Sequence, residues 1–174
     1  REGEITAAEA IASGQLTTRA VLAEAVNVLD RTFANGGTGE ELSVVSPDGV
    51  VTRGATGPST PEGGALSASM PQVEGENNTL IHSHITGLVE IGGNQFGSSA
   101  LEPTDIDLAT FQGFQTNIIV GKEGRPQFRN EEVMVNELTG LTRTERVSVP
   151  RNNVIAFFNR QGASTTTISP RAAG

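Results

Sequence analysis

Apolar residues recur at helical spacing in one long stretch near the start of the chain. In "TTRAVLAEAVNVLDRTF", residues 17–33, they fall on one face of a helix, at Val21, Leu22, Ala25, Val28 and Leu29. Thr17 or Thr18 is suited to cap this helix, and the glycine-rich "ANGGTG" is suited to end it. The pattern predicts an amphipathic helix that packs one face against a core.

Two shorter stretches carry the signals of helix starts. "TAAEAIASG", residues 6–14, has Thr6 and Glu9 at capping-box spacing. "PTDIDLATFQGF", residues 103–114, has Thr104 directly after a proline and acidic residues in the turn that follows. We expect a short helix at each place.

β-Branched and alternating apolar residues dominate much of the remaining chain. "EELSVVSPDGVVTRGATG", residues 40–57, has such runs on both sides of "SPDG", which predicts a hairpin. "TLIHSHI", residues 79–85, predicts a strand that is buried at its start and polar at its end. Further strands are predicted within residues 116–130, where two are joined by a turn, and at 131–138, 143–150 and 152–160.

Small and polar residues interrupt this pattern in three places. Residues 58–78 are rich in Gly, Pro, Ser and Asn and predict a long surface loop. Residues 86–102 read as a glycine-rich insertion without a clear period, and loops of this length are usually functional or mobile. The small, polar tail, residues 161–174, is predicted to be flexible.

The order of these elements predicts an α/β fold in which a single mixed β-sheet is flanked by helices. We expect an N-terminal helical segment at residues 1–37, a core at residues 38–160 and the flexible tail at residues 161–174. A chain of 174 residues suits one domain, and an apolar fraction of 36% with 21 glycines indicates a small core with many turns.

Charge and composition exclude several classes of protein. The net charge is −8 and the basic residues are scattered, so we expect no nucleic-acid partner. No apolar run approaches the roughly 18 residues that a membrane-spanning helix needs. The chain lacks cysteine, so no disulfide framework supports it. Because it does not begin with methionine, we expect a fragment or a processed product of a longer protein.

Both histidines of the chain stand two positions apart, in "TLIHSHITG". Residues i and i+2 of a strand point to the same face, so His82 and His84 can hold one metal ion together. Catalytic zinc typically has three protein ligands, and without cysteine the third must be a carboxylate. Asp107, in the first turn of the helix that Thr104 would cap, is the best candidate, and Asp105 is the alternative.

A hydrolytic zinc site also needs a general base near its water. A glutamate of "GEELSVV", Glu40 or Glu41, is placed to supply it. Each feature also has a structural explanation. Histidines at a strand end can bond to loop groups, Thr104 and Asp107 form a plain capping box, and paired glutamates at a strand start are usually solvated.

The order of these motifs resembles the JAMM (JAB) metalloprotease family. "HSHITG" is similar to the family's "HTHPTG" turn, "PTDIDL" to its "PSxxDL", and "EELSVV" to its Glu-x-x-Gly followed by apolar residues. The resemblance covers roughly residues 38 to 122. Ser43 stands in place of the family's glycine and Ile85 in place of its proline, and the segment between His84 and Thr104 is longer than in the family.

The resemblance implies a cytidine-deaminase-like core and a role for each matched residue. His82, His84 and Asp107 would hold Zn²⁺. Glu40, preferred to Glu41 because of its spacing, would pass a proton from the zinc-activated water to the leaving amine. Thr104 stands where the family has serine, so its hydroxyl would stabilise the oxyanion.

The resemblance further implies a protease or isopeptidase that cleaves a protein or peptide substrate, often ubiquitin-like. JAMM-like domains also occur as toxin domains of bacterial polymorphic secreted proteins. We therefore expect a secreted or delivered effector with a cognate immunity protein, or otherwise a cytoplasmic protein. The alternatives are a non-catalytic JAMM-like binding or scaffold domain, a metal-dependent nuclease, or a β-rich protein without a site. A zinc deaminase would need cysteine ligands that the chain lacks.

Overall fold

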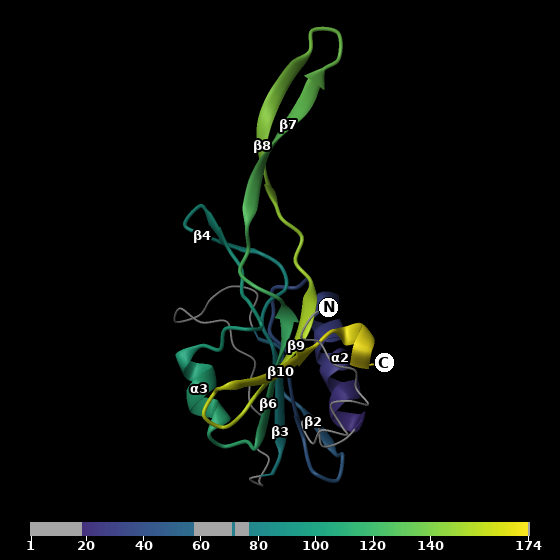
Figure 1. Cartoon of the computed structure of the whole chain (residues 1–174), viewed down its shortest axis with the longest axis vertical. Coiled ribbons are helices and arrows are strands. Elements are labelled where there is room, and N and C mark those ends of the chain that lie inside the picture. Colours follow the sequence, from purple (N-terminus) through teal and green to yellow (C-terminus); the bar gives the residue numbers. More distant parts are fainter. Residues whose placement is uncertain (1–18, 58–70, 72–76, 174) are drawn as a thin grey trace.

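The computed structural model of the chain describes residues 19–57, 71 and 77–173. Within them the protein is α/β, and a mixed six-stranded sheet lies between two helices (Figure 1). The sheet order is β10-β9-β6-β3-β1-β2. Its members are β1 (Leu42–Val45), β2 (Val51–Arg53), β3 (Thr79–Ser83), β6 (Thr116–Lys122), β9 (Asn153–Phe158) and β10 (Ser164–Ile168).

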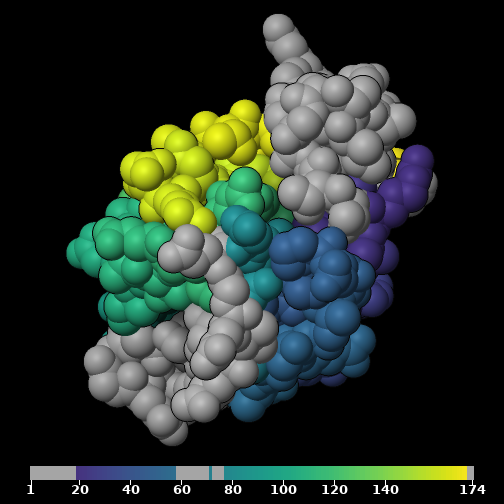
Figure 2. All heavy atoms as spheres, turned by 90° about the horizontal axis from the view of Figure 1, so that it is seen from below, coloured from purple at the N-terminus to yellow at the C-terminus, as the bar shows by residue number. Residues whose placement is uncertain are grey.

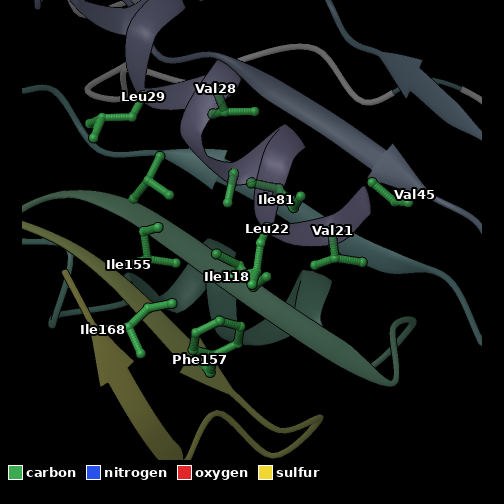
Figure 3. Close-up of a cluster of buried hydrophobic side chains, with 12 residues drawn as sticks. Val21, Leu22, Val28, Leu29, Val45, Ile81, Ile118, Ile155, Phe157 and Ile168 are labelled. Atoms are coloured by element: carbon green, nitrogen blue, oxygen red, sulfur yellow. The ribbon is translucent and has the colours of Figure 1, made fainter. Parts of the chain in front are cut away.

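The helix α2 (Arg19–Ala34) confirms the long amphipathic helix predicted from the sequence. Its apolar face, which includes Leu22 and Val28, packs against Ile81 and Ile118 of the sheet and against other side chains of the same face (Figure 3). Burying side chains of this size stabilises a fold by about 1.5–3 kcal/mol each. Helix α2 is therefore part of the core.

The opposite face of the sheet packs against α3 (Asp105–Phe111). Phe111 is fully buried there against a cluster that includes Leu80, Ile119 and Phe158. Because side chains alternate along a strand, Ile81 faces α2, whereas Leu80 and His82 face α3. The rings of His82 and Phe111 accordingly lie 6.2 Å apart between centroids.

The predicted hairpin of residues 40–57 is confirmed as β1 and β2, which pair antiparallel. Strand β3 pairs antiparallel with β1, where Leu42 lies opposite His82, and parallel with β6, where Ile119 lies opposite His82. In the view from below (Figure 2), the β1–β2 hairpin (blue) and the C-terminal segment (yellow) lie on different sides of the body, as expected for β2 and β10 at opposite edges of one sheet.

The insertion at residues 86–102 contains a second hairpin, formed by β4 (Val89–Ile91) and β5 (Asn94–Phe96). Gly92 and Gly93 join its strands with φ values of 60° and 83°. Positive φ at both central residues is typical of the tight turns that join hairpin strands. The Gly-Gly pair is a hairpin signal that can be read from the sequence. The sequence analysis did not predict this hairpin because it looked for one pattern across the whole of residues 86–102.

The strands β7 (Phe128–Asn136) and β8 (Leu141–Ser148) pair only with each other among the described strands and stand clear of the body as a long arm (Figure 1). Strands were predicted in both segments, but the second strand within residues 116–130 and the strand at residues 131–138 form one continuous strand, β7. The prediction of a single sheet is wrong among the described strands. None of the described arm residues belongs to the buried apolar core. Met134, Val135, Leu138 and Leu141 are exposed on its outer half.

The prediction of a flexible tail is also wrong within the described residues. Ser164–Ile168 form β10, which pairs antiparallel with β9, and Ile168 is fully buried in the α2 side of the core. A short 3-10 helix, η1 (Pro170–Ala173), follows. The predicted helix at residues 6–14, the caps Thr17 and Thr18, and most of the predicted loop at 58–78 lie outside the described residues.

A buried polar network joins α2 to the first hairpin. Ser43 donates a hydrogen bond to Glu24 (2.5 Å), and Arg31 donates to Glu24 (3.1 Å) and to Ser43 Oγ (3.0 Å). Burial raises the pKa of Glu24, but the hydrogen bonds from Ser43, Asn27 and Arg31 outweigh burial and hold the pKa below its usual value. Ser43, which replaces a glycine of the resembled motif, thus anchors a buried carboxylate.

Candidate metal centre

His82 and His84 lie side by side at the end of β3, in the middle of the sheet. His82 is within the strand, and His84 follows it by two positions, where its backbone N donates to Val120 O of β6 (3.0 Å). This bond continues the parallel pairing beyond the assigned strand, so the two side chains share one face. Their ring centroids lie 5.3 Å apart, and both side chains are buried.

Asp107 reaches both imidazoles from the first turn of α3. Its backbone N donates to Thr104 Oγ1 (3.1 Å) and its Oδ2 accepts from Thr104 N (2.9 Å), which confirms the predicted capping box. Asp107 Oδ1 lies 3.1 Å from His82 Nε2, and Asp107 Oδ2 lies 2.9 Å from His84 Nε2. One carboxylate therefore faces both histidines, as the sequence analysis predicted.

The hydrogen bond of His84 to Ser99 determines what can lie between His84 Nε2 and Asp107. Its Nδ1 lies 2.7 Å from the carbonyl O of Ser99, which can only accept, so Nδ1 carries a hydrogen. If His84 were neutral, its Nε2 would carry no hydrogen. The Nε2 lone pair would then face a carboxylate oxygen of Asp107. Either a proton or a metal ion must lie between them. The sequence analysis gave a hydrogen bond to a loop group as the alternative role of a histidine at a strand end. His84 makes such a bond through Nδ1 to Ser99, and its Nε2 still faces Asp107.

His82 adds an independent sign. Both of its ring nitrogens are buried without a hydrogen-bond partner among the described residues, although Nε2 is close to Asp107. Buried polar atoms without partners are rare in folded proteins and call for an explanation. A metal ion on Nε2 would supply that partner. Two imidazole nitrogens and one carboxylate, with ligand atoms within 4.8 Å of one another, form a set that could hold a metal ion.

The charges of the cluster are strongly coupled. Burial lowers the pKa of His82 and outweighs the attraction of Asp107. For His84, burial also acts to lower the pKa, but Asp107, Glu40 and the Ser99 carbonyl outweigh it and raise the pKa. Burial acts to raise the pKa of Asp107, yet the two imidazoles hold that pKa well below its usual value. Asp107 is therefore an ionised, ligand-ready carboxylate at neutral pH.

The adjacent glutamates Glu40 and Glu41 have different surroundings. Glu40 lines a cleft together with His84 and Thr104. Burial, with a smaller contribution from Asp107, raises the pKa of Glu40 to about 8, although His84 acts in the opposite direction. Glu41 is buried and accepts hydrogen bonds from Asn35 (2.7 Å) and Thr56 (3.1 Å). Only Glu40 of the pair is thus placed to act on a molecule in the cleft.

Thr104 and Asp105, the other two predicted site residues, also differ in their surroundings. Thr104 lines the cleft, and its Oγ1 accepts from Asp107 N, which leaves its own hydroxyl hydrogen free to donate. Asp105, the alternative ligand, is exposed and is not in the cluster of metal-ligating groups. The structure therefore favours Asp107 over Asp105 as the third ligand.

The cleft beside the cluster has a volume of about 560 Å³. Three segments far apart in the sequence form its walls: residues 95–99 after the turn of the second hairpin, residues 102–104 at the start of α3, and residues 125–128 at the base of the arm. Loops that converge on a buried cluster are a common way to build a ligand site. The sequence predicted an insertion here but not the wall that it forms.

Ser99 is a residue that the sequence analysis missed. Its carbonyl orients His84, and its buried Oγ accepts from Leu101 N (3.1 Å) and Gly124 N (3.0 Å). Arg151 ties the same region together, because its guanidinium donates to Ser98 O (2.7 Å) and Gly124 O (2.9 Å). Partners that orient metal-ligating histidines strongly affect metal affinity. No local sequence signal marks them, because their partners lie in distant segments.

Comparison with protein-family models, with curated proteins and with solved structures finds no match for this chain. Among the described helices, none is long and apolar enough to cross a membrane.

Proposed function

We propose that this protein is a zinc-dependent metallopeptidase of the JAMM type, which hydrolyses a peptide or isopeptide bond. One observation carries the proposal. His84, one of the three residues of the buried cluster with His82 and Asp107, lines a cleft that Glu40 and Thr104 also line. Three protein ligands of the nitrogen and oxygen type are typical of catalytic zinc, whereas structural zinc is usually held by four.

The chain's own groups support a hydrolytic sequence. Zn²⁺, when bound, supplies Lewis-acid activation and lowers the pKa of water to about 7. Glu40 accepts a proton from the attacking water as the carbon–oxygen bond forms. Thr104 donates its hydroxyl hydrogen to the oxyanion that develops from the carbonyl. Glu40 then passes its proton to the leaving amine as the carbon–nitrogen bond breaks.

The raised pKa of Glu40, about 8 in the metal-free protein, suits a group that must both accept and release a proton near neutral pH. A nearby divalent cation would lower this pKa, because it stabilises the carboxylate. Glu40 would then be ionised when the site is loaded and ready to accept the first proton.

We also propose that the fold is the cytidine-deaminase-like core of the JAMM family. The order of elements supports this assignment: α2, the β1–β2 hairpin, β3 with the histidines at its end, α3 with Asp107, and then β6 beside β3. A ubiquitin-like substrate, a role as a secreted or delivered effector, and a cognate immunity protein remain predictions that follow from the resemblance.

The test combines metal content with cleavage. The full chain, purified without chelators, should contain close to one zinc per molecule by elemental analysis and should cleave peptides in a mixed library. Glu40→Gln should retain the zinc and lose cleavage. Zinc binding without cleavage by the unaltered chain would instead identify a non-catalytic binding domain. Absence of stoichiometric metal would refute the zinc assignment.

A further inference from the structure

The cleft beside the metal centre has an apolar wall that hydrolysis itself does not require. Phe96, at the end of β5, is 49% exposed and lines the cleft. Phe128 and Pro126 line it from the base of the arm. Phe128 is half-buried, and the Arg146 guanidinium lies 4.1 Å from the centre of its ring. Aromatic side chains that line a concave site are typical of ligand binding.

We propose that Phe96, Pro126 and Phe128 form a subsite for one large apolar side chain of the polypeptide substrate, adjacent to the scissile bond. The proposal rests on the peptidase function and specifies its substrate class. Position supports it, because the same cleft is lined by His84, Glu40 and Thr104. A side chain held against Phe96 therefore belongs to a residue close to the reacting carbonyl.

The charges around the cleft favour an uncharged side chain. Glu102 and Arg125, at its rim, neutralise each other through two hydrogen bonds of 2.7 and 3.0 Å. A charged substrate side chain would lose hydration here without gaining a free counter-charge from Glu102 or Arg125, whereas an apolar side chain loses nothing comparable.

The wall is held in place before any substrate binds. Gly97 lies so close to the arm base that an added Cβ would be 2.6 Å from Pro126 Cγ and 2.9 Å from Leu88 Cδ2. Arg151 joins Ser98 and Gly124, on two sides of the same junction. Pre-formed sites bind without first having to order their loops, which favours a defined side-chain preference.

The first experiment measures specificity. The zinc-loaded full chain digests a mixed peptide library, and mass spectrometry identifies the cleaved bonds. Phe, Tyr, Leu and Met should exceed Lys and Glu by about tenfold at one position next to the scissile bond. Phe96→Ala should reduce that preference severalfold. Phe33→Ala is the matched control, because Phe33 is 43% exposed on α2 and does not line the cleft, and it should retain the preference.

The second experiment needs no activity. N-acetyl-phenylalaninamide titrated into the metal-free chain should shift the NMR amide signals of residues 95–98 and 127–128, and N-acetyl-glutamate amide should not. Phe96→Ala should abolish these shifts. Cleavage without an apolar preference, or shifts that appear only elsewhere, would overturn the subsite and leave the peptidase standing. Shifts at these residues without cleavage of any peptide would overturn the peptidase and leave an apolar binding site.

Discussion

Glu40 and Glu41 are neighbours in the chain, yet Glu40 lines the cleft beside His84, whereas Glu41 is buried and accepts hydrogen bonds from Asn35 and Thr56. The two carboxylates therefore have separable effects. Glu40→Gln should lower the hydrolytic rate by about 10²- to 10⁴-fold, the usual contribution of a general base, with little change in stability.

Glu41→Gln should show the opposite behaviour. It replaces an acceptor of two hydrogen bonds with a group that is itself partly a donor, which should cost about 1–3 kcal/mol of unfolding free energy. Urea denaturation and a cleavage assay on both variants check the pair. Equal losses of rate in the two variants would contradict the assignment of Glu40 as the base.

Asp107 and Asp105 offer a matched pair for the metal. Asp107→Asn removes the carboxylate that faces both imidazoles, and zinc bound after dialysis should fall well below one per chain. Asp105→Asn alters an exposed carboxylate outside the cluster and should keep full stoichiometry. Elemental analysis of both variants measures the difference, and retention of zinc by Asp107→Asn would exclude it as an essential ligand.

Ser99 should influence metal affinity without touching the metal. Ser99→Ala removes the hydroxyl that accepts from Leu101 N and Gly124 N, so the carbonyl that orients His84 is held less firmly. Zinc affinity, measured by competition with a chelating dye, should fall about 10- to 100-fold. The adjacent Ser98→Ala is the control. If the two variants bind zinc equally, the Ser99 hydroxyl does not position His84.

The lowered pKa of Glu24 should make the free energy of unfolding depend on pH, independently of the metal centre. The pKa of Glu24 in the folded protein lies below the unfolded value of about 4.5. Ionised Glu24 therefore stabilises the fold above that pH, and the contribution is lost as the pH falls through the folded pKa. The destabilisation caused by Glu24→Gln, measured by urea unfolding of the metal-free protein, should be about 1–3 kcal/mol at pH 7 and smaller at pH 3. A constant difference across this range would contradict the lowered pKa.

The β7–β8 arm should be dispensable for folding. Phe128 pairs with Ser148 at its base, so an Asn-Gly turn can replace residues 129–147 without separating the flanking segments. Because no arm residue belongs to the apolar core among the described residues, the free energy of unfolding should change by less than about 1 kcal/mol. Calorimetry and zinc content of the shortened chain check this. A large loss of stability would mean that the arm packs against the body.

Local signals account for what was predictable. The apolar spacing of α2 and the capping box of Thr104 and Asp107 lie within a few residues, so both elements were predicted, together with the histidine pair on β3. Position relative to distant segments was not predictable. The sequence of β7 is typical of a strand, but it carries no signal that β7 pairs with β8 outside the six-stranded sheet.

Two other differences have similar causes. Strand β10, "STTTI", is polar because an edge strand is held by backbone hydrogen bonds, and only Ile168 must be buried. Whether Glu40 or Glu41 is the candidate base depends on Asn35 and Thr56, because both donate hydrogen bonds to the Glu41 carboxylate. Neither partner can be identified as such from the sequence around the glutamates.

The central place of β3 links metal loading to the folding of the whole molecule. Its histidines lie between β1 and β6, so the ligand set cannot form in a chain whose sheet has come apart. An ion that binds only the assembled state stabilises it by about 2.7 kcal/mol when its free concentration is 100 times its dissociation constant. A melting curve recorded against a series of divalent ions would thus rank them by affinity, with no need to know any substrate.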